Sequence, residues 1–281
     1  MLYPSARGPR GALLSGVEEA VRVKVVVYHY FAVSEYRLAY MSWREAGKYF
    51  SENDVALLPV GSTEQHGPHN PLGTDHLVAY RLALEAGRRV GVVVLPPVPF
   101  GVSVHHSTFP GTIWVEEEVF KRYVKCVALS LRCHGVRRLV VVNGHGGNLA
   151  ALLSLARGLR REHGMLVVVY QWWTAVRSCE EVKALFTPSE EGHAAAMETS
   201  LNLYLHPEAV RMEEAVDEEA ARLETDGLGF YPEYTVDRTR SGVFGVSTTA
   251  SREKGEKVFE AAVKALVELV EKVKRVEFHL T

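Results

Sequence analysis

Three side chains of types that bind metal ions lie close together in the segment GSTEQHGPHNPLGTDH, which runs from 61 to 76. Glu64 and His66 are two positions apart, so in an extended chain both project to the same side. The glycines and prolines that follow can turn the chain and bring Asp75 back towards them. Carboxylates and an imidazole form a ligand set suited to zinc, manganese or iron. The alternative is a turn-rich loop in which Asp75 only caps the following helix.

A second candidate ligand, His145, stands among glycines in the segment VVVNGHGGN, which ends an apolar run. The neighbouring glycines, Gly146 among them, allow the backbone to approach a bound group closely. A glycine-rich turn before a helix can instead hold a phosphate. The segment lacks the lysine and the spacing of a P-loop, so we favour His145 as a metal ligand and Gly146 as part of a substrate-binding surface.

The third segment is GHAAAMETS, from 192 to 200. His193 and Glu198 are five positions apart, roughly 140° around a helix axis, so one helix face holds both only loosely. Both reach the same cleft if His193 precedes the first regular turn. The alternative is an ordinary helix with a polar cap and an exposed glutamate. His106 and Trp173 follow two other apolar runs and are further candidates for lining a substrate pocket.

Apolar runs of strand length alternate with segments of helical period along most of the chain. The runs lack the period-2 alternation of half-exposed strands, which indicates a mostly parallel sheet covered by helices on both faces. Ligands of such sheets bind beyond the carboxyl ends of the strands, where all three segments fall. The predicted strands are 54–61, 91–98, 137–144 and 165–172, and the predicted helices are 42–50, 75–90, 115–133, 148–163, 193–205 and 256–276.

The composition is that of an ordinary globular protein. The chain has 281 residues, 47% of them hydrophobic, and a formal net charge of −2, which excludes a largely disordered chain and does not favour a nucleic-acid partner. It contains no uninterrupted apolar run of spanning length and no export signal, so we expect no membrane partner and a cytoplasmic location. Residues 1–36, with a possible strand at 24–33, are expected to form an N-terminal extension, and 217–255 a long lid-like loop.

The segments GSTEQHGPHNPLGTD, FPGT, NGHGGN and HAAAMETS, in this order, resemble the creatininase family of metal-dependent amidohydrolases. The resemblance covers 37–281, which we expect to be a single catalytic domain. It implies a three-layer α/β/α sandwich around a mostly parallel sheet, two divalent metal ions and a homo-oligomer, often a hexamer. At matching positions, Glu64 and His145 would hold one ion, His66 the other, and Asp75 would bridge them.

The sequence departs from creatininase itself at one position. A second metal-binding glutamate stands there two residues after the histidine of the NGH segment, and here that residue is Gly147. We expect Glu198 to take its place as a ligand. The departure weakens the case for creatinine as the substrate. Family members with glycine at this position include formamidopyrimidine-nucleotide deformylases and a peptidase of mycofactocin maturation, and the motifs do not choose among them.

The resemblance implies hydrolysis of a non-peptide or cyclic C–N amide bond in a small molecule by a metal-bridging hydroxide. Metal coordination lowers the pKa of water to about 7 and polarises the carbonyl group. His193 is the candidate that delivers a proton to the departing nitrogen, and Glu198 either completes the metal site or carries the proton. Two alternatives stay open, a non-catalytic module that binds a nucleotide or phosphate at the NGHGGN turn, and a one-metal lyase or aldolase.

Overall fold

The computed structural model describes residues 36–221 and 232–278. The chain divides into two compact units, and all described residues belong to the second, Ser34–Thr281. The possible strand at 24–33 and nearly all of the expected N-terminal extension therefore lie outside the described residues. None of the helices in the described part of the chain is long and apolar enough to cross a membrane.

Four strands in the described residues form one parallel sheet in the order β2-β1-β3-β4. Their bounds are β1 Val55–Val60, β2 Val93–Val94, β3 Arg138–Asn143 and β4 Leu166–Gln171. Three strands agree with the sequence within two residues at each end. The second was predicted over 91–98 but keeps strand geometry for two residues only, because Pro96 and Pro97 cannot donate hydrogen bonds to a neighbouring strand.

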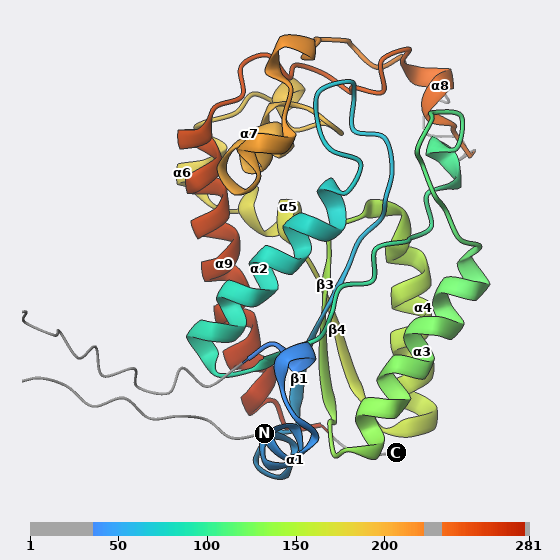
Figure 1. The fold of residues 1–281 in the computed structure, drawn as a ribbon, viewed down its shortest axis with the longest axis vertical. Coiled ribbons are helices and arrows are strands. Elements are labelled where there is room, and N and C mark those ends of the chain that lie inside the picture. The colour runs from blue at the N-terminus through green and yellow to red at the C-terminus, as the bar shows by residue number, and fades with distance from the viewer. Residues whose placement is uncertain (1–35, 222–231, 279–281) are drawn as a thin grey trace, which may run out of the picture. The chain divides into compact units, whose positions relative to one another are not determined.

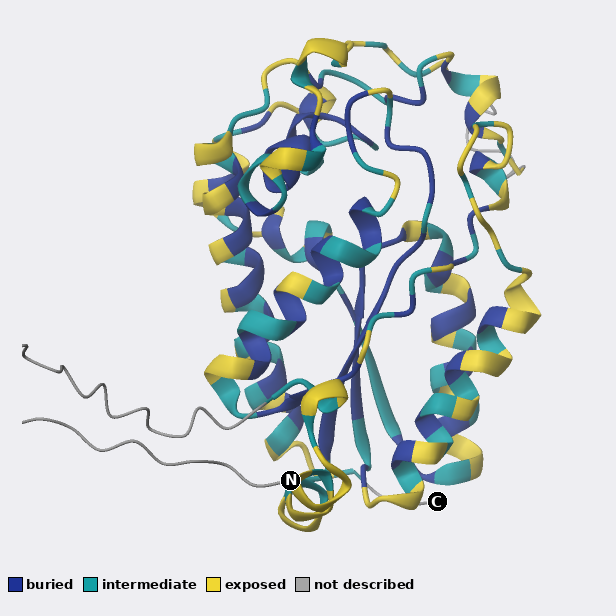
Figure 2. Cartoon of the chain, in the orientation of Figure 1, coloured by how far each residue is buried: buried dark blue, intermediate teal, exposed yellow. Residues whose placement is uncertain are grey.

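The sheet is covered on both faces, which confirms the three-layer α/β/α architecture (Figure 1). Leu57 of β1 packs in one core with α2 (Thr74–Val90), α7 (Ala196–Leu205) and α9 (Arg252–Arg275). Leu58 packs in a second core on the opposite face, with α3 (Glu117–Cys133) and α4 (Leu149–His163). The central strands are buried on both faces (Figure 2), as uninterrupted apolar runs predict.

Several helix boundaries follow from local signals. Ser42 and Glu45 form the predicted capping box at the start of α1 (Trp43–Glu52). Two boundaries differ from the prediction by more than two residues. The last helix, α9, begins four residues earlier than expected because Ser251 caps it through the backbone N–H of Lys254. The helix predicted over 193–205 begins at Ala196. The shorter helices are α5 Trp172–Val176, α6 Glu180–Lys183 and α8 Thr235–Arg238.

The three motif segments meet beyond the carboxyl ends of the strands. Loop 61–73 follows β1, the NGHGGN turn follows β3, and the turn before α7 lies over the same end. The described parts of 217–255 contain α8, the first turn of α9 and a single bridge between Glu218 and Gly245, so the part before α9 is a long excursion with little regular structure.

Candidate metal centre

The glycine that follows β3 brings two of the motif segments into contact. A Cβ atom at Gly144 would overlap the carbonyl oxygen of Asp75, so only glycine lets the end of β3 pack against the first turn of α2. Asp75 is not the N-cap of that helix, because Gly73 takes that place. Its side chain is instead turned towards the histidines.

Asp75 lies between two imidazoles. Its Oδ1 is 3.0 Å from His66 Nε2, and its Oδ2 is 3.1 Å from His145 Nδ1. Glu64 Oε2 lies 3.1 Å from the same nitrogen of His145, and Glu198 Oε2 lies 3.9 Å from His66 Nε2. The structure therefore brings together all five predicted ligands, as two groups that share Asp75.

Backbone carbonyl groups fix the tautomers of both imidazoles. His66 Nδ1 donates a hydrogen bond to the carbonyl of Glu64 at 3.1 Å, and His145 Nε2 donates to the carbonyl of Val102 at 3.0 Å. The other nitrogen of each ring then faces carboxylate oxygens. An outer hydrogen bond that turns the free imidazole nitrogen inwards is typical of histidines that bind metals.

The inward-facing atoms lack hydrogen-bond partners. Both carboxylate oxygens of Glu64, Nε2 of His66 and Oδ2 of Asp75 are buried and form no hydrogen bond to any described residue. Unpaired buried polar atoms are costly, so a set of them aimed at one point indicates a bound group. Separations of 3.0–3.1 Å suit ligands that share an ion at roughly 2.0–2.2 Å from each.

The pKa values indicate how this cluster compensates its charge. Burial lowers the pKa of His66, but Asp75 outweighs burial and raises it to about 10. Burial raises the pKa of Glu198 to about 7 and also raises that of Glu64. Burial acts in the same direction on Asp75, but His66 and His145 hold its pKa below the ordinary value. The buried carboxylates thus require positive charge, and divalent cations fit this donor set.

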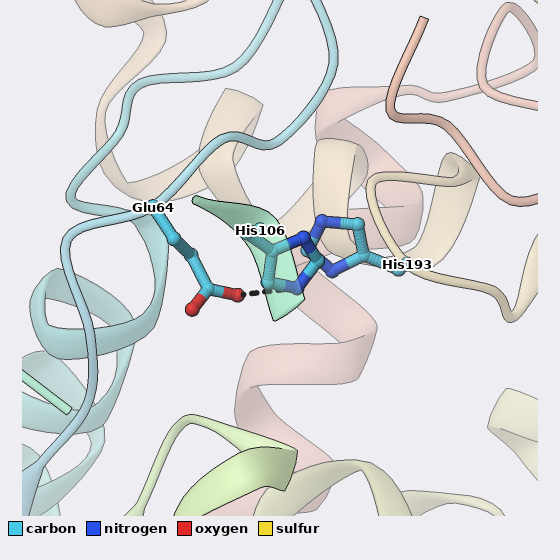
Figure 3. Close-up of side chains that lie close together, drawn as sticks. All are labelled: Glu64, His106 and His193. Carbon is cyan, nitrogen blue, oxygen red and sulfur yellow. Dashed lines mark ion pairs between the residues drawn. The ribbon is translucent and has the colours of Figure 1, made fainter. Parts of the chain in front are cut away.

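Another trio, shown in Figure 3, consists of Glu64, His106 and His193. His106 Nε2 lies 3.2 Å from Glu64 Oε1. The rings of His106 and His193 stack at 4.6 Å between centroids with an interplanar angle of 23°. Imidazole lone pairs lie in the ring plane, so two stacked rings cannot both direct a lone pair at one cation. This geometry favours a role beside the reacting substrate for the two histidines.

A cavity of about 340 Å³ opens onto the cluster. The predicted substrate-binding residues His106, Gly146 and Trp173 line it, as do His193 and Glu198. Among the predicted ligands, Glu64, Asp75 and His145 also line the cavity, whereas His66 is fully buried and is not part of the lining.

Gly147 has no room for a side chain. A Cβ atom at this position would overlap the carbonyl oxygen of Val102 and would lie 2.5 Å from Nε2 of His145. Glu198 approaches the centre from α7 instead. The backbone N–H of Ala194 donates to Glu198 Oε2 at 2.7 Å, and Ala194 has a φ of +56°, which is strained for a residue with a Cβ.

Gln65 is a further polar residue of the site, and it was not predicted from the sequence. Its Nε2 lies 2.9 Å from both His106 Nδ1 and His193 Nε2 and donates to the carbonyl of Gly242 at 3.2 Å. Its Oε1 accepts from the N–H of Gly67, which fixes the orientation of the amide. Strand-like alternation places Gln65 on the side opposite to Glu64 and His66, so the pattern gave no reason to select it.

A buried polar network behind the cluster was also missed. Asn202 Nδ2 on α7 donates to Asn70 Oδ1 at 3.0 Å and to Thr74 Oγ1 at 2.9 Å. Asn70 in turn donates to Thr199 Oγ1 at 2.9 Å. The network ties the start of α2, next to Asp75, to α7, next to Glu198. Its members come from two segments, 70–74 and 199–202, that lie far apart in the sequence, so only their contacts reveal it.

The creatininase family model, described as creatinine amidohydrolase, matches residues 39–270. A 3-dehydro-scyllo-inosose hydrolase of Thermotoga maritima is 28% identical over 82% of this chain and 81% of its own. A mycofactocin precursor peptide peptidase of Mycolicibacterium smegmatis is 32% identical over 78% of this chain and 85% of its own.

Solved structures agree with this relationship. A crystal structure of creatinine amidohydrolase superimposes with a TM-score of 0.75 at 29% identity and covers 86% of this chain and 99% of its own. Other creatininase structures, described as a zinc–zinc form and a manganese form, have TM-scores of 0.74 and 0.75 at 26% identity. The α/β fold, the matched family model and the convergent carboxylates and imidazoles lead to one conclusion: this chain belongs to the creatininase family of metal-dependent hydrolases that act on C–N bonds.

Proposed function

We propose that the protein hydrolyses a non-peptide or cyclic C–N amide bond with the aid of two divalent metal ions, zinc, manganese or iron. In this proposal Glu64 and His145 hold one ion, His66 and Glu198 hold the other, and Asp75 bridges them. The observation that carries it is the position of Asp75, whose two oxygens face one imidazole each, 3.0 and 3.1 Å away.

The ions, when bound, would supply Lewis acidity to the carbonyl group and lower the pKa of the attacking water. The chain supplies the ligands in a fixed form. Three carboxylates gathered in a largely buried place require positive charge, which divalent cations would supply. The hydrogen bonds of His66 and His145 to backbone carbonyls hold a proton on the outer nitrogen of each ring, so the inward-facing nitrogen is the one that would bind an ion once its own proton is displaced.

His193 is proposed to move the proton. Its Nε2 donates to the carbonyl of Gln65 at 2.9 Å, and its Nδ1 has no hydrogen-bond partner among the described residues. Burial, reinforced by His66, lowers the pKa of His193 well below its ordinary value, so the ring is neutral at neutral pH. Nδ1 can therefore accept the proton released from water and pass it to the departing nitrogen as the C–N bond breaks.

The cavity lining supports a role in substrate binding for His106, Gly146 and Trp173. His106 accepts at Nδ1, from Gln65 or from Thr235 Oγ1 at 2.6 Å, and can donate from Nε2 towards the reacting group. Gly146 has open space where a Cβ would stand, so substrate can approach its backbone. Trp173 offers an aromatic surface.

The substrate is proposed to be a small-molecule amide. Named relatives act on an inosose derivative, a peptide and creatinine, so membership of the family does not select one of them. We further propose a closed homo-oligomer, a hexamer, in the cytoplasm. Light scattering of the purified protein tests the assembly, and a monomer would contradict it.

Metal analysis of protein purified without chelator, followed by a substrate panel, tests the proposed function. The panel contains creatinine, a formamidopyrimidine nucleotide, hydantoin, short peptides and 3-dehydro-scyllo-inosose. Two metal equivalents and chelator-sensitive hydrolysis of an amide are expected. One tightly held equivalent would favour a lyase or aldolase. Phosphate-ligand binding that survives chelation and Glu64→Ala would favour a non-catalytic binding module.

A further inference from the structure

One wall of the cavity is formed by α5 and the residue that follows it. Trp173 and Arg177 are four positions apart, about one helical turn, and both line the cavity. Neither contributes to the carboxylate–imidazole cluster. An aromatic surface beside a permanent positive charge can recognise a ligand but has no acid or base to contribute at neutral pH.

The charge of Arg177 is opposite to that of the carboxylates that line this cavity. Of the described residues that line it, Arg177 alone is a lysine or arginine, whereas four are carboxylates. Three of these, Glu64, Asp75 and Glu198, belong to the metal centre. The fourth, Glu191, pairs with Arg177. Cations at the metal centre would neutralise the first three, and the guanidinium of Arg177 would then face no unbalanced acidic group.

The guanidinium of Arg177 is held in place by two hydrogen bonds and keeps further N–H donors without a partner among the described residues. Its Nε donates to Glu191 Oε2 at 2.7 Å, and its NH2 donates to the backbone carbonyl of Glu191 at 2.9 Å. NH1 has no hydrogen-bond partner among the described residues, and 45% of the side chain is exposed. A guanidinium fixed in this way keeps N–H groups available for the oxygens of a carboxylate or phosphate, which its planar fork fits well.

We propose that Arg177 is a specificity-determining residue that binds an anionic group of the substrate, a carboxylate or a phosphate, while Trp173 packs against its apolar part. The inference rests on the proposed function and names the class of substrate, an amide with an anionic substituent. The cavity volume of about 340 Å³ is near the lower limit of small-molecule sites, so the substrate is compact.

A structural role for Arg177 makes a different prediction. Glu191 is two residues before His193, so the ion pair could serve only to hold the segment that carries this histidine. Loss of such a clamp would weaken the binding of charged and neutral ligands alike. Loss of an anion-binding group would weaken the binding of charged ligands alone.

Calorimetric titration of the metal-loaded protein separates the two roles without requiring turnover. The probes are N-acetylglycine, its neutral analogue N-acetylglycinamide, and inorganic phosphate. Arg177→Gln is expected to weaken the binding of at least one anion roughly 10- to 100-fold and that of N-acetylglycinamide by less than about twofold. The anion that loses more identifies a carboxylate or a phosphate as the preferred group.

Two further variants complete the test. Arg177→Lys keeps the charge without the planar fork and is expected to recover part of the anion affinity. Arg161→Gln removes an arginine of a similar surface ion pair, Arg161–Glu162, outside the cavity lining, and is expected to change nothing.

Equal losses for charged and neutral probes in Arg177→Gln, unchanged anion affinity, or no anion binding by the wild-type protein would each overturn the inference. Metal analysis of the same samples keeps it distinct from the proposed function. Anion binding that depends on Arg177 in a protein that holds no metal would support the inference and refute the hydrolase.

Discussion

Replacing Asp75 by asparagine tests the bridging assignment most directly, because the side chain keeps its shape and loses its charge. Asp75 contacts His66 at 3.0 Å and His145 at 3.1 Å, so it belongs to both ligand groups. A charge-assisted contact contributes about 1.5–3 kcal/mol, so an ion that loses its contact with this carboxylate should bind roughly 10- to 100-fold more weakly, and the two ions together roughly 10²- to 10⁴-fold more weakly. Because the contacts are divided between the groups, both ions should bind more weakly.

The assay is a competition titration against a chromophoric chelator, with metal content measured after dialysis. Asp75→Asn is expected to lose both equivalents, whereas Glu198→Gln should weaken only the ion held with His66. Glu268→Gln, an equivalent change at an exposed carboxylate on α9, is the control and should behave as wild type. An Asp75→Asn protein that holds two ions with wild-type affinity would refute the bridging role and the two-ion proposal with it.

The remaining predictions concern residues that pack beside the site, its proton transfer and the dependence of its stability on pH. Gly147→Ala should lower the free energy of unfolding by about 1–3 kcal/mol and weaken metal binding, because the added Cβ displaces His145. Denaturant unfolding and metal analysis measure the two effects, and an unchanged protein would contradict the tight packing. Asn202→Leu leaves buried acceptors unpaired and should cost about 1–3 kcal/mol of unfolding free energy, with weaker metal binding because the network supports the segments of Asp75 and Glu198; unchanged stability and metal affinity would contradict this role. His193→Asn should keep the metal content and slow hydrolysis by about 10²- to 10⁴-fold, whereas loss of metal would make the residue a ligand. The pKa of His66 is raised from 6.5 to about 10, so in metal-free protein the stability that its protonation contributes is complete below about pH 6.5 and is lost as the pH rises to about 10. Unfolding measured as a function of pH should show this decline with chelator present and little of it with metal bound.

The sheet could be predicted well because burial on both faces leaves a clear pattern. Uninterrupted apolar runs such as LVVV at 139–142, rich in β-branched residues and only a few residues long, are typical of strands that helices cover on both sides. The second strand was predicted too long because the apolar run continues through two prolines, which keep hydrophobic character but break strand pairing. The helix at 193–205 was predicted to begin too early, because alanines at 194 and 195 favour a helix that the turn before Glu198 overrides.

The part of the candidate site that could be predicted consists of residues whose side-chain type is typical of metal ligands. Glycines next to His145 and the spacing between Glu64, His66 and Asp75 drew attention to groups that the structure now brings together. Gln65 gave no such signal, since a neutral amide in an extended segment is unremarkable until its partners are known. Its importance depends on His106, 41 positions away, and on His193, 128 positions away.

The sequence by itself therefore determined the parallel α/β architecture and the identities of the acidic and imidazole groups, because hydrophobic period and residue chemistry are local properties. Tertiary structure decided which nitrogen of each histidine faces the carboxylates, that no side chain fits at Gly147, and that Arg177 shares a cavity with Glu64. These depend on distances of a few ångströms between residues far apart in the chain, and such distances exist only after the helices have packed on the sheet.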